Sequence, residues 1–385
     1  MPIPGFGGIA GVAQCDDGSV AAAYALNVAS SEVYARARGR VVRICDSVGD
    51  ALTLRLRLVE EIGRVVGFDA YAWLMTDPET SVGSAPLADV PLLPELPRQL
   101  PQLIRLKYLT TVNRWTTLGG AEVALLREST GGDLSRSRLW RELLDGLGVI
   151  DVASSVFKDR FGCWGFLDLW RSESSVPFSR ADAAFLVGIT EPVTMALRAS
   201  QANTFLAPHS RDARQLGPVV LLLSPDLEVL GQTPETQAYL RILVPPDEGR
   251  APIPASAYNV AAQLLAAEAG IDRNPPTARV HLSAGLWVTL RAARIGNVDS
   301  SGERNVAVSI EETSPAERVT LFARAFGLTV REAELLDHLT TGSGTREIAH
   351  RMFLSEHTVQ DHLKSIFAKT GLRNRRTVLS RALGT

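Results

Sequence analysis

The stretch that decides the fold of the C-terminal part is 355-SEHTVQDHLKSIFAKTG-371. Ser355 stands where a helix cap is expected, and Gly371 follows the last periodic residue, as is typical of a helix end. Between them, apolar residues recur at helical spacing and share one face, namely Val359, Leu363, Ile366 and Phe367. The stretch therefore predicts a capped amphipathic helix that packs its apolar face against a core.

The opposite face of this helix is polar and carries His357, Gln360, Asp361 and Lys364, at positions i, i+3, i+4 and i+7. Such side chains can read base edges, since Gln matches adenine, Lys matches guanine and Asp matches the amino group of cytosine. We therefore expect this face to enter the major groove of DNA. A second interpretation of Asp361 is that it only solvates the helix or restrains Lys364, three residues on.

Shorter helical segments surround this helix, and from Pro315 onward the pattern is helical throughout. Residues 328–342 begin with Thr329 and Glu332 in the spacing of a capping box. Residues 345–352 predict a helix of two turns, and a last helix follows Asn374. Two helices joined by a turn of about three residues form a helix-turn-helix unit.

The charge of the chain is unevenly distributed. From Leu328 to Thr385 there are nine Lys and Arg residues against six Asp and Glu, a net charge of +3. The preceding 327 residues carry −5, which the whole-chain value of −2 conceals. No acid follows Asp361, and the basic residues beyond it are Lys364, Lys369, Arg373, Arg375, Arg376 and Arg381. This end of the chain is therefore suited to binding an anion such as the phosphate backbone of DNA.

The segment resembles the LuxR-type helix-turn-helix domain, the C-terminal DNA-binding module of many bacterial regulators. The resemblance rests on LT-x-RE-x-E-x-L at 328–336, TG at 341–342, EIA at 347–349, LS-x-x-TV-x-x-HL-x-x-IF-x-K at 354–369 and GLRNR at 371–375. It implies an all-α tetrahelical domain whose third helix enters the major groove of double-stranded DNA. It also implies that the fourth helix pairs with a second copy, giving a homodimer.

The resemblance also implies site residues. It makes Gln360 and Lys364 base-facing and Lys369 a phosphate contact, although family members often have a basic or a small residue at positions 360 and 361. The residues expected to contact DNA are Thr345, Arg346, Thr358, Gln360, Asp361, Lys364, Lys369, Arg373 and Arg375. On the last helix, Val378, Leu379 and Ala382 form an apolar stripe that we expect to make the dimer contact.

The upstream part predicts two α+β units. In the first, a helix over 50–66, a strand over 68–75 and paired strands near 149–157 and 163–170 precede a closing helix over 178–200. In the second, a hairpin turns at Pro225–Asp226, and strands return over 278–294 and 305–313. The first unit resembles a GAF-like sensor and the second, smaller one a PAS-like domain.

The domain boundaries follow from these patterns. We expect a helical N-terminal segment over 1–44, the GAF-like domain over 45–200, a polar linker over 201–213, the PAS-like domain over 214–312 and the helix-turn-helix domain over 313–385. A chain of 385 residues with 45% apolar and 21% charged residues is consistent with a multidomain globular protein.

Several classes of protein are not supported. Cys15, Cys45 and Cys163 form no C-x-x-C pair, and the histidines of the tail have no acid or cysteine arranged as a second ligand, so we expect no metal and no cofactor. G-x-x-x-x-G-K, G-x-S-x-G and H-E-x-x-H motifs do not occur, so no enzymatic activity is predicted. The absence of a signal sequence or of a long apolar run predicts a cytoplasmic protein without membrane contact.

The sequence thus predicts a DNA-binding transcriptional regulator whose upstream domains sense a small-molecule effector or a partner. Aromatic residues on strands, such as Trp73 and Trp170, could line a sensor pocket, but aromatic residues at such positions are more often core. The alternative is a protein-interaction scaffold whose DNA-binding tail is unregulated.

Overall fold

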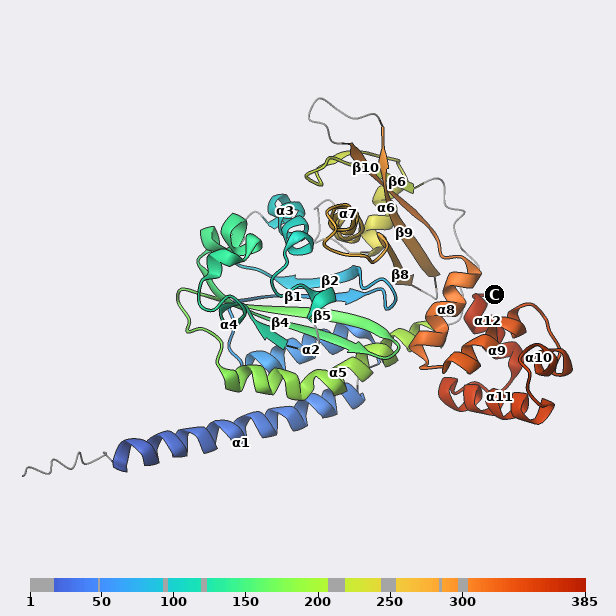
Figure 1. Cartoon of the computed structure of the whole chain (residues 1–385), viewed down its shortest axis with the longest axis horizontal. Helices are drawn as coiled ribbons and strands as arrows, with labels where there is room; N and C mark the ends of the chain where they lie inside the picture. Colours follow the sequence, from blue (N-terminus) through green and yellow to red (C-terminus); the bar gives the residue numbers. More distant parts are fainter. Residues whose placement is uncertain are drawn as a thin grey trace, which may run out of the picture.

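The computed structural model describes residues 17–47, 49–92, 96–118, 123–206, 219–243, 254–283, 286–296 and 304–385. Two five-stranded antiparallel sheets with their helices are followed by a helical C-terminal part (Figure 1). We call the strands β1–β5 sheet 1 and the strands β6–β10 sheet 2.

The two sheets have the same strand order. Sheet 1 is ordered β2-β1-β5-β4-β3 and sheet 2 is ordered β7-β6-β10-β9-β8. The strands of sheet 1 are β1 Ala70–Thr76, β2 Gly83–Asp89, β3 Val123–Leu125, β4 Val149–Asp159 and β5 Gly162–Ser172. Those of sheet 2 are β6 Val219–Leu223, β7 Val229–Gln232, β8 Thr277–Ser283, β9 Leu286–Ile295 and β10 Asn305–Glu312.

Helices cover both faces of sheet 1. The helices α1 Asp17–Ser47, α2 Ala51–Gly63 and α5 Arg180–Leu206 lie on one face, and α3 Leu96–Leu109 lies on the other (Figure 1). Because side chains alternate along a strand, Trp73 of β1 packs with the first group and Leu74 packs toward α3. Short helical segments connect β2 to β4, namely η1 Trp115–Thr117, α4 Leu126–Ser129, η2 Leu134–Arg136, η3 Trp140–Leu144 and η4 Asp145–Leu147.

The second unit shares its core with the first. Its helix α7 (Ala255–Glu268) lies between sheet 2 and the α3 side of sheet 1, whereas α6 (Thr236–Leu243) packs on sheet 2 alone (Figure 1). Small residues such as Ala257, Ala261 and Ala262 allow neighbouring elements to approach α7 closely. Residues on most sides of α7 are buried, as expected for a helix enclosed by protein. The two sheets therefore belong to one packed body.

Buried ion pairs join the two units. Arg279 of β8 donates through Nε and Nη2 to the two carboxylate oxygens of Asp77, each at 2.7 Å, and its side chain is 5% exposed. Arg114, after α3, pairs with Asp272, after α7, at 2.6 Å. Although burial opposes it, the carboxylates of Asp77 and Glu79 hold the pKa of Arg279 above its ordinary value. Arg279 therefore stays charged and depends on these two carboxylates.

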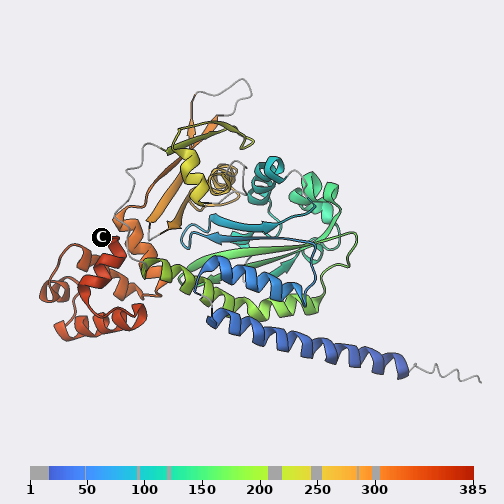
Figure 2. The same cartoon turned by 180° about the vertical axis from the view of Figure 1, so that it is seen from behind.

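The C-terminal part contains α8 Pro315–Ala325, α9 Val330–Thr340, α10 Thr345–Arg351, α11 Glu356–Thr370 and α12 Arg375–Leu383. It lies at one end of the molecule, against the C-terminal end of α5, in both views (Figures 1 and 2). The Phe205 ring of α5 stacks on Trp287 of β9, with ring centroids 5.1 Å apart, and meets Phe322 of α8 edge-on at 5.5 Å. Nη1 of Arg324 also donates to the carbonyl oxygen of Phe161 at 2.8 Å.

The structure corrects several expectations. Helix α5 continues to Leu206, so residues 201–206 are helical and not a linker, and residues 207–213 lie outside the described residues. Helix α1 continues past residue 44 to Ser47, and residues 1–16 are not described. The helix α8 precedes the four helices expected in the C-terminal part. The sequence patterns also missed β2, β3, α3 and α7.

Removing the cation of the Asp77 pair should loosen the contact between the two units. We expect Arg279→Met to lower the free energy of unfolding by about 3–5 kcal/mol, because it leaves the buried carboxylate of Asp77 with backbone N–H donors but without a counter-ion. Urea unfolding followed by circular dichroism measures the loss. Arg291→Met is the control, since Arg291 on the neighbouring strand makes exposed ion pairs and should cost below about 1 kcal/mol. Equal unfolding midpoints for the two variants would contradict the structural role of the buried pair.

Candidate nucleic-acid interface

A short turn joins the two central helices of the C-terminal part. The helix α10 ends at Arg351, and Phe353 in the turn has a φ of +55° and an almost fully exposed ring. Ser355 Oγ then accepts a hydrogen bond from the backbone N–H of Thr358 at 3.0 Å and caps α11. Gly371, with a φ of +67°, ends α11 in a left-handed conformation that favours glycine.

One face of α11 is buried, as the sequence predicts. Val359, Leu363 and Ile366 are buried and Phe367 is half-buried, and all belong to the same apolar cluster as the buried leucines of α9. This packing fixes the rotation of α11 about its axis and therefore determines which residues face outward.

The outward face of α11 carries the four polar residues expected there. His357, Gln360, Asp361 and Lys364 are exposed. The carboxylate of Asp361 accepts a hydrogen bond from Lys364 Nζ at 3.0 Å, and this bond lowers the pKa of the Asp361 carboxyl. The same carboxylate lies 3.4 Å from Nε2 of His357. This contact favours the interpretation in which Asp361 restrains Lys364. Among the described residues, the Gln360 amide makes one long hydrogen bond, from Nε2 to Thr345 Oγ1 at 3.5 Å, so it is available to a base edge.

The other residues expected at DNA flank this face. Arg346 at the start of α10 and Arg373 after α11 are exposed, and neither makes an ion pair with any residue that the structure describes. Thr345 and Thr358, at the N-terminal ends of α10 and α11, are half-buried. Arg375 is different, because its guanidinium donates to the backbone carbonyl of Ser343 and holds the start of α12 against the turn before α10.

Lys369 has a structural partner. Its Nζ lies 2.6 Å from Oε2 of Glu332 in α9, and Ser365 Oγ donates to Oε1 of the same carboxylate. Glu332 is 3% exposed, and although burial opposes it, these hydrogen bonds and those from Thr329 lower the pKa of Glu332 to about 2. Lys369 thus joins α9 to α11, and because its residue is exposed and its ammonium group has three donors, its contact with a phosphate stays a prediction.

The apolar stripe of α12 is also explained by the domain itself. Val378 and Ala382 are 1% and 0% exposed and belong to the apolar cluster that contains α8 and α9. Their side chains are therefore not available to a second copy in this arrangement, contrary to the expectation. Leu379 is half-buried.

A cavity lies beside sheet 1, and its lining includes Trp170, one of the two strand aromatics named as possible pocket residues, but not Trp73. This cavity, which we call the α3 cavity, has a volume of about 440 Å³ and lies between sheet 1, α3 and α7. Lys107 of α3 and Asp168 of β5 form a buried ion pair at 2.6 Å on its wall. Three of the residues that line it have a buried polar atom that makes no hydrogen bond within the part of the chain that the structure describes, namely Trp115 Nε1, Trp170 Nε1 and Asn259 Oδ1. Such atoms are rare in proteins unless a bound molecule supplies their partners.

Two other kinds of site find no support in the described part of the chain. No group of three or more His, Cys, Asp or Glu residues is placed to hold a metal ion among the residues that could be searched. None of the described helices is both long enough and apolar enough to cross a membrane.

The C-terminal helices match a known family. Residues 327–382, which include α9 to α12, match the family described as "Bacterial regulatory proteins, luxR family". The CsgBAC operon transcriptional regulatory protein of Escherichia coli (strain K12) is 44% identical over 53 residues, which are 14% of this chain and 24% of that protein. The probable HTH-type transcriptional regulator GfsR of Streptomyces halstedii is 40% identical over 60 residues, 16% of this chain and 25% of that protein. The chain thus spans about a quarter of the length of these relatives.

Similarity to solved structures extends further along the chain but is low. Escherichia coli SdiA aligns with a TM-score of 0.31 and 12% identity, over 90% of this chain and 96% of that chain. VqmA of Vibrio cholera, in a complex with a ligand and DNA, aligns with a TM-score of 0.19 and 19% identity, over 44% of this chain and 83% of that chain. At these TM-scores, the upstream units are best interpreted from their own geometry.

The ion pair of Glu332 should make the C-terminal helices sensitive to acid. Because the folded-state pKa of about 2 lies below the ordinary value of 4.5, the stabilisation is complete above pH 4.5 and is lost as the pH falls toward 2. We expect Glu332→Gln to lower the free energy of unfolding by about 1–3 kcal/mol at neutral pH and by progressively less below pH 4.5. Urea unfolding at several pH values measures this difference. Glu334→Gln, on the same helix but exposed, is the control, and equal pH profiles for the two variants would contradict the assignment.

Proposed function

We propose that this chain, whose residues 327–382 form a DNA-binding domain of the LuxR family, is a transcriptional regulator with ligand-controlled DNA binding. The LuxR family consists of transcription regulators and not of enzymes. The observation that carries the proposal is α11, which buries one face against α9 and presents Gln360 and Lys364 outward.

In the mechanism that we propose, α11 lies in the major groove of double-stranded DNA. Gln360 reads an adenine edge and Lys364, held by Asp361, reads a guanine edge or a phosphate. The exposed Arg346 and Arg373, together with the Thr345 and Thr358 hydroxyls, contact the flanking phosphates. Lys369 and Arg375 contact the phosphates as well, and their bonds to Glu332 and Ser343 hold the helices that carry the reading residues.

Two copies would bind paired half-sites, as is common for helix-turn-helix proteins. Of the apolar stripe on α12, only Leu379 is half-buried rather than buried. We therefore propose that a dimer contact of α12 uses Leu379, while Val378 and Ala382 support α12 from within the domain.

The α3 cavity is the proposed effector site. Sheet 1 and its helices then act as a GAF-like sensor, and sheet 2 acts as a PAS-like unit that closes the cavity through α7. The indole N–H groups of Trp115 and Trp170 would donate hydrogen bonds to acceptors on the ligand, and Asn259 Oδ1 would accept one from a donor. A cavity that is mostly apolar and has a few such groups is typical of small-molecule sites.

The first test of this proposal separates base reading from phosphate binding. Gln360→Ala should cost about 1–3 kcal/mol on the preferred site and relax the preference at one base position, without changing the salt dependence. Arg373→Ala should weaken binding to all DNA sequences alike. It should also reduce the slope of log K against log salt concentration by about 0.9, the share of one phosphate contact. Selection from a random DNA pool with the full chain, followed by salt titration, measures both effects. An unchanged base preference in Gln360→Ala would mean that α11 is not the reading helix.

The second test concerns the effector. The full chain is screened for thermal stabilisation against a panel of small metabolites, since a ligand of the folded state raises its stability. Trp170→Phe should weaken any ligand of the α3 cavity by about tenfold, because it removes a hydrogen-bond donor and little volume. Trp73→Phe is the control, since its indole N–H is equally buried and has no hydrogen-bond partner among the described residues, but Trp73 does not line the α3 cavity. A panel without any stabilising compound would favour the alternative of a scaffold with an unregulated DNA-binding tail.

A further inference from the structure

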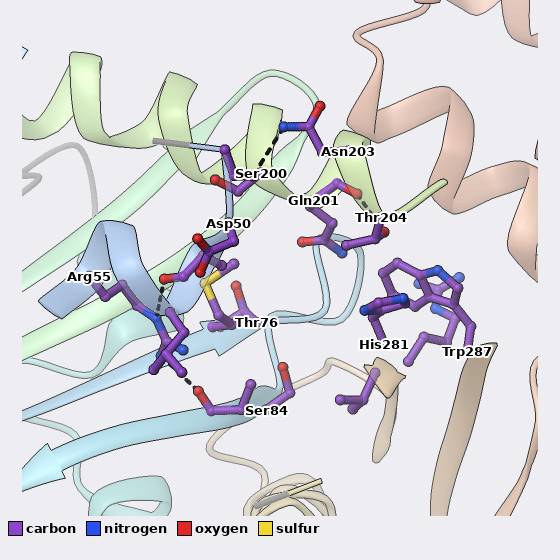
Figure 3. A pocket seen from close by; sticks show the side chains of 17 residues that line it. Asp50, Arg55, Thr76, Ser84, Ser200, Gln201, Asn203, Thr204, His281 and Trp287 are labelled. Atoms are coloured by element: carbon purple, nitrogen blue, oxygen red, sulfur yellow. Dashed lines mark hydrogen bonds between the residues drawn. The ribbon is translucent and has the colours of Figure 1, made fainter. Parts of the chain in front are cut away.

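A second cavity lies where sheet 1, sheet 2 and the C-terminal helices come together. This cavity, which we call the junction cavity, has a volume of about 420 Å³. Its walls are the start of α2, the end of β1, the start of β2, the end of α5, and parts of β8 and β9 (Figure 3). The cavity is thus bounded by both sheet units, and none of its lining residues lines the α3 cavity.

One wall of the junction cavity carries a buried cation without a counter-ion. Arg55 of α2 is 4% exposed, and within the described ranges its guanidinium donates to three backbone carbonyls and to no side chain, namely those of Ala51, Trp73 and Ala85. No carboxylate among the described residues lies within ion-pair distance of it. Burial accordingly lowers the pKa of Arg55 to about 10. Buried charges are normally paired, so an anion in the cavity would compensate this guanidinium.

The other charged residues of the cavity are already engaged. Arg279 is neutralised by Asp77 and Glu79. The carboxylate of Asp50 caps α2 by accepting a hydrogen bond from the backbone N–H of Thr53 at 2.8 Å. Arg55 is therefore the lining cation whose charge is left for a ligand.

Two polar side chains add hydrogen-bonding capacity. Gln201 of α5 is 8% exposed, and its amide points into the cavity and makes no hydrogen bond with any described residue (Figure 3). Ser84 also lines the cavity and is 4% exposed, and its hydroxyl makes no hydrogen bond with the described residues. The remaining walls are apolar or aromatic, and the indole of Trp287 forms a flat surface beside Val280 and Met75.

We propose that the junction cavity binds a small aromatic carboxylate. The carboxylate is held by Arg55 and the Gln201 amide, and the ring lies against Trp287. A charge-assisted hydrogen bond to a guanidinium supplies the polar recognition, and ring stacking supplies the apolar recognition. This site is separate from the α3 cavity and does not depend on it.

The position of the site gives it a route to the DNA-binding domain. Trp287 stacks on Phe205, and Phe205 meets Phe322 of α8. A ring that packs against Trp287 is therefore connected through three aromatic contacts to Phe322, in the helix that begins the C-terminal part.

The test uses the full chain labelled with 5-fluorotryptophan, whose resonances are assigned by single Trp→Phe variants. Trp287 reports on the junction cavity, and Trp115 and Trp170 report on the α3 cavity. Naphthalene-2-carboxylate is titrated, followed by the uncharged 2-naphthalenemethanol. We expect the carboxylate to shift the Trp287 resonance and the alcohol to bind at least about tenfold more weakly.

Variants assign the recognition to named residues. Arg55→Gln should remove the preference for the carboxylate over the alcohol, whereas Arg57→Gln, on the exposed face of the same helix, should keep it. If Arg55→Gln unfolds the chain, Gln201→Leu takes its place. This variant should weaken binding of the carboxylate by about tenfold without changing binding of the alcohol.

Three outcomes would overturn the inference. The first is a Trp287 resonance that neither compound moves, and the second is equal affinity for the two compounds. The third is that the carboxylate shifts the resonances of Trp115 and Trp170 but not that of Trp287. This result would support the effector site of the α3 cavity and reject the junction site.

Discussion

The buried ion pair between Arg279 and Asp77 is the constraint on which the arrangement of the two sheets depends. Both side chains are buried, so water cannot solvate either charge if the pair separates. The end of β1 and the strand β8 must therefore stay together. With β8 held there, sheet 2 has one position relative to sheet 1, and α7 fills the space between them. Both cavities follow from this placement, because each is lined by residues of both units.

A shared core makes the upstream units a single mechanical element. The cluster that contains Leu74 and Phe166 of sheet 1 also contains Val260 of α7 and Leu290 of sheet 2. A ligand in the α3 cavity would therefore act on both units at once and not on a separate sensor module. The C-terminal helices join the other large cluster, which begins at α1 and passes through α5 to α12.

Local patterns in the sequence predicted the C-terminal part better than the upstream part. The faces of α11 follow from the spacing of Val359, Leu363 and Ile366, because a helix repeats every few residues. The helix α7 escaped detection because it is enclosed and has no polar stripe, and β2 escaped because Pro86 interrupts it. Partnerships between distant residues leave no local pattern, so neither Lys107–Asp168 nor Lys369–Glu332 could be predicted.

The aromatic contact from Trp287 through Phe205 to Phe322 has a consequence for energetics as well as for geometry. Suppose that the placement of α8 differs between the free and the DNA-bound protein. Any compound that prefers one placement must then change the affinity for DNA, and DNA must change the affinity for that compound by the same factor. The contacts among the three rings would then couple the two sites in both directions. The operator sequence would change the affinity for a metabolite as much as the metabolite changes the affinity for that operator.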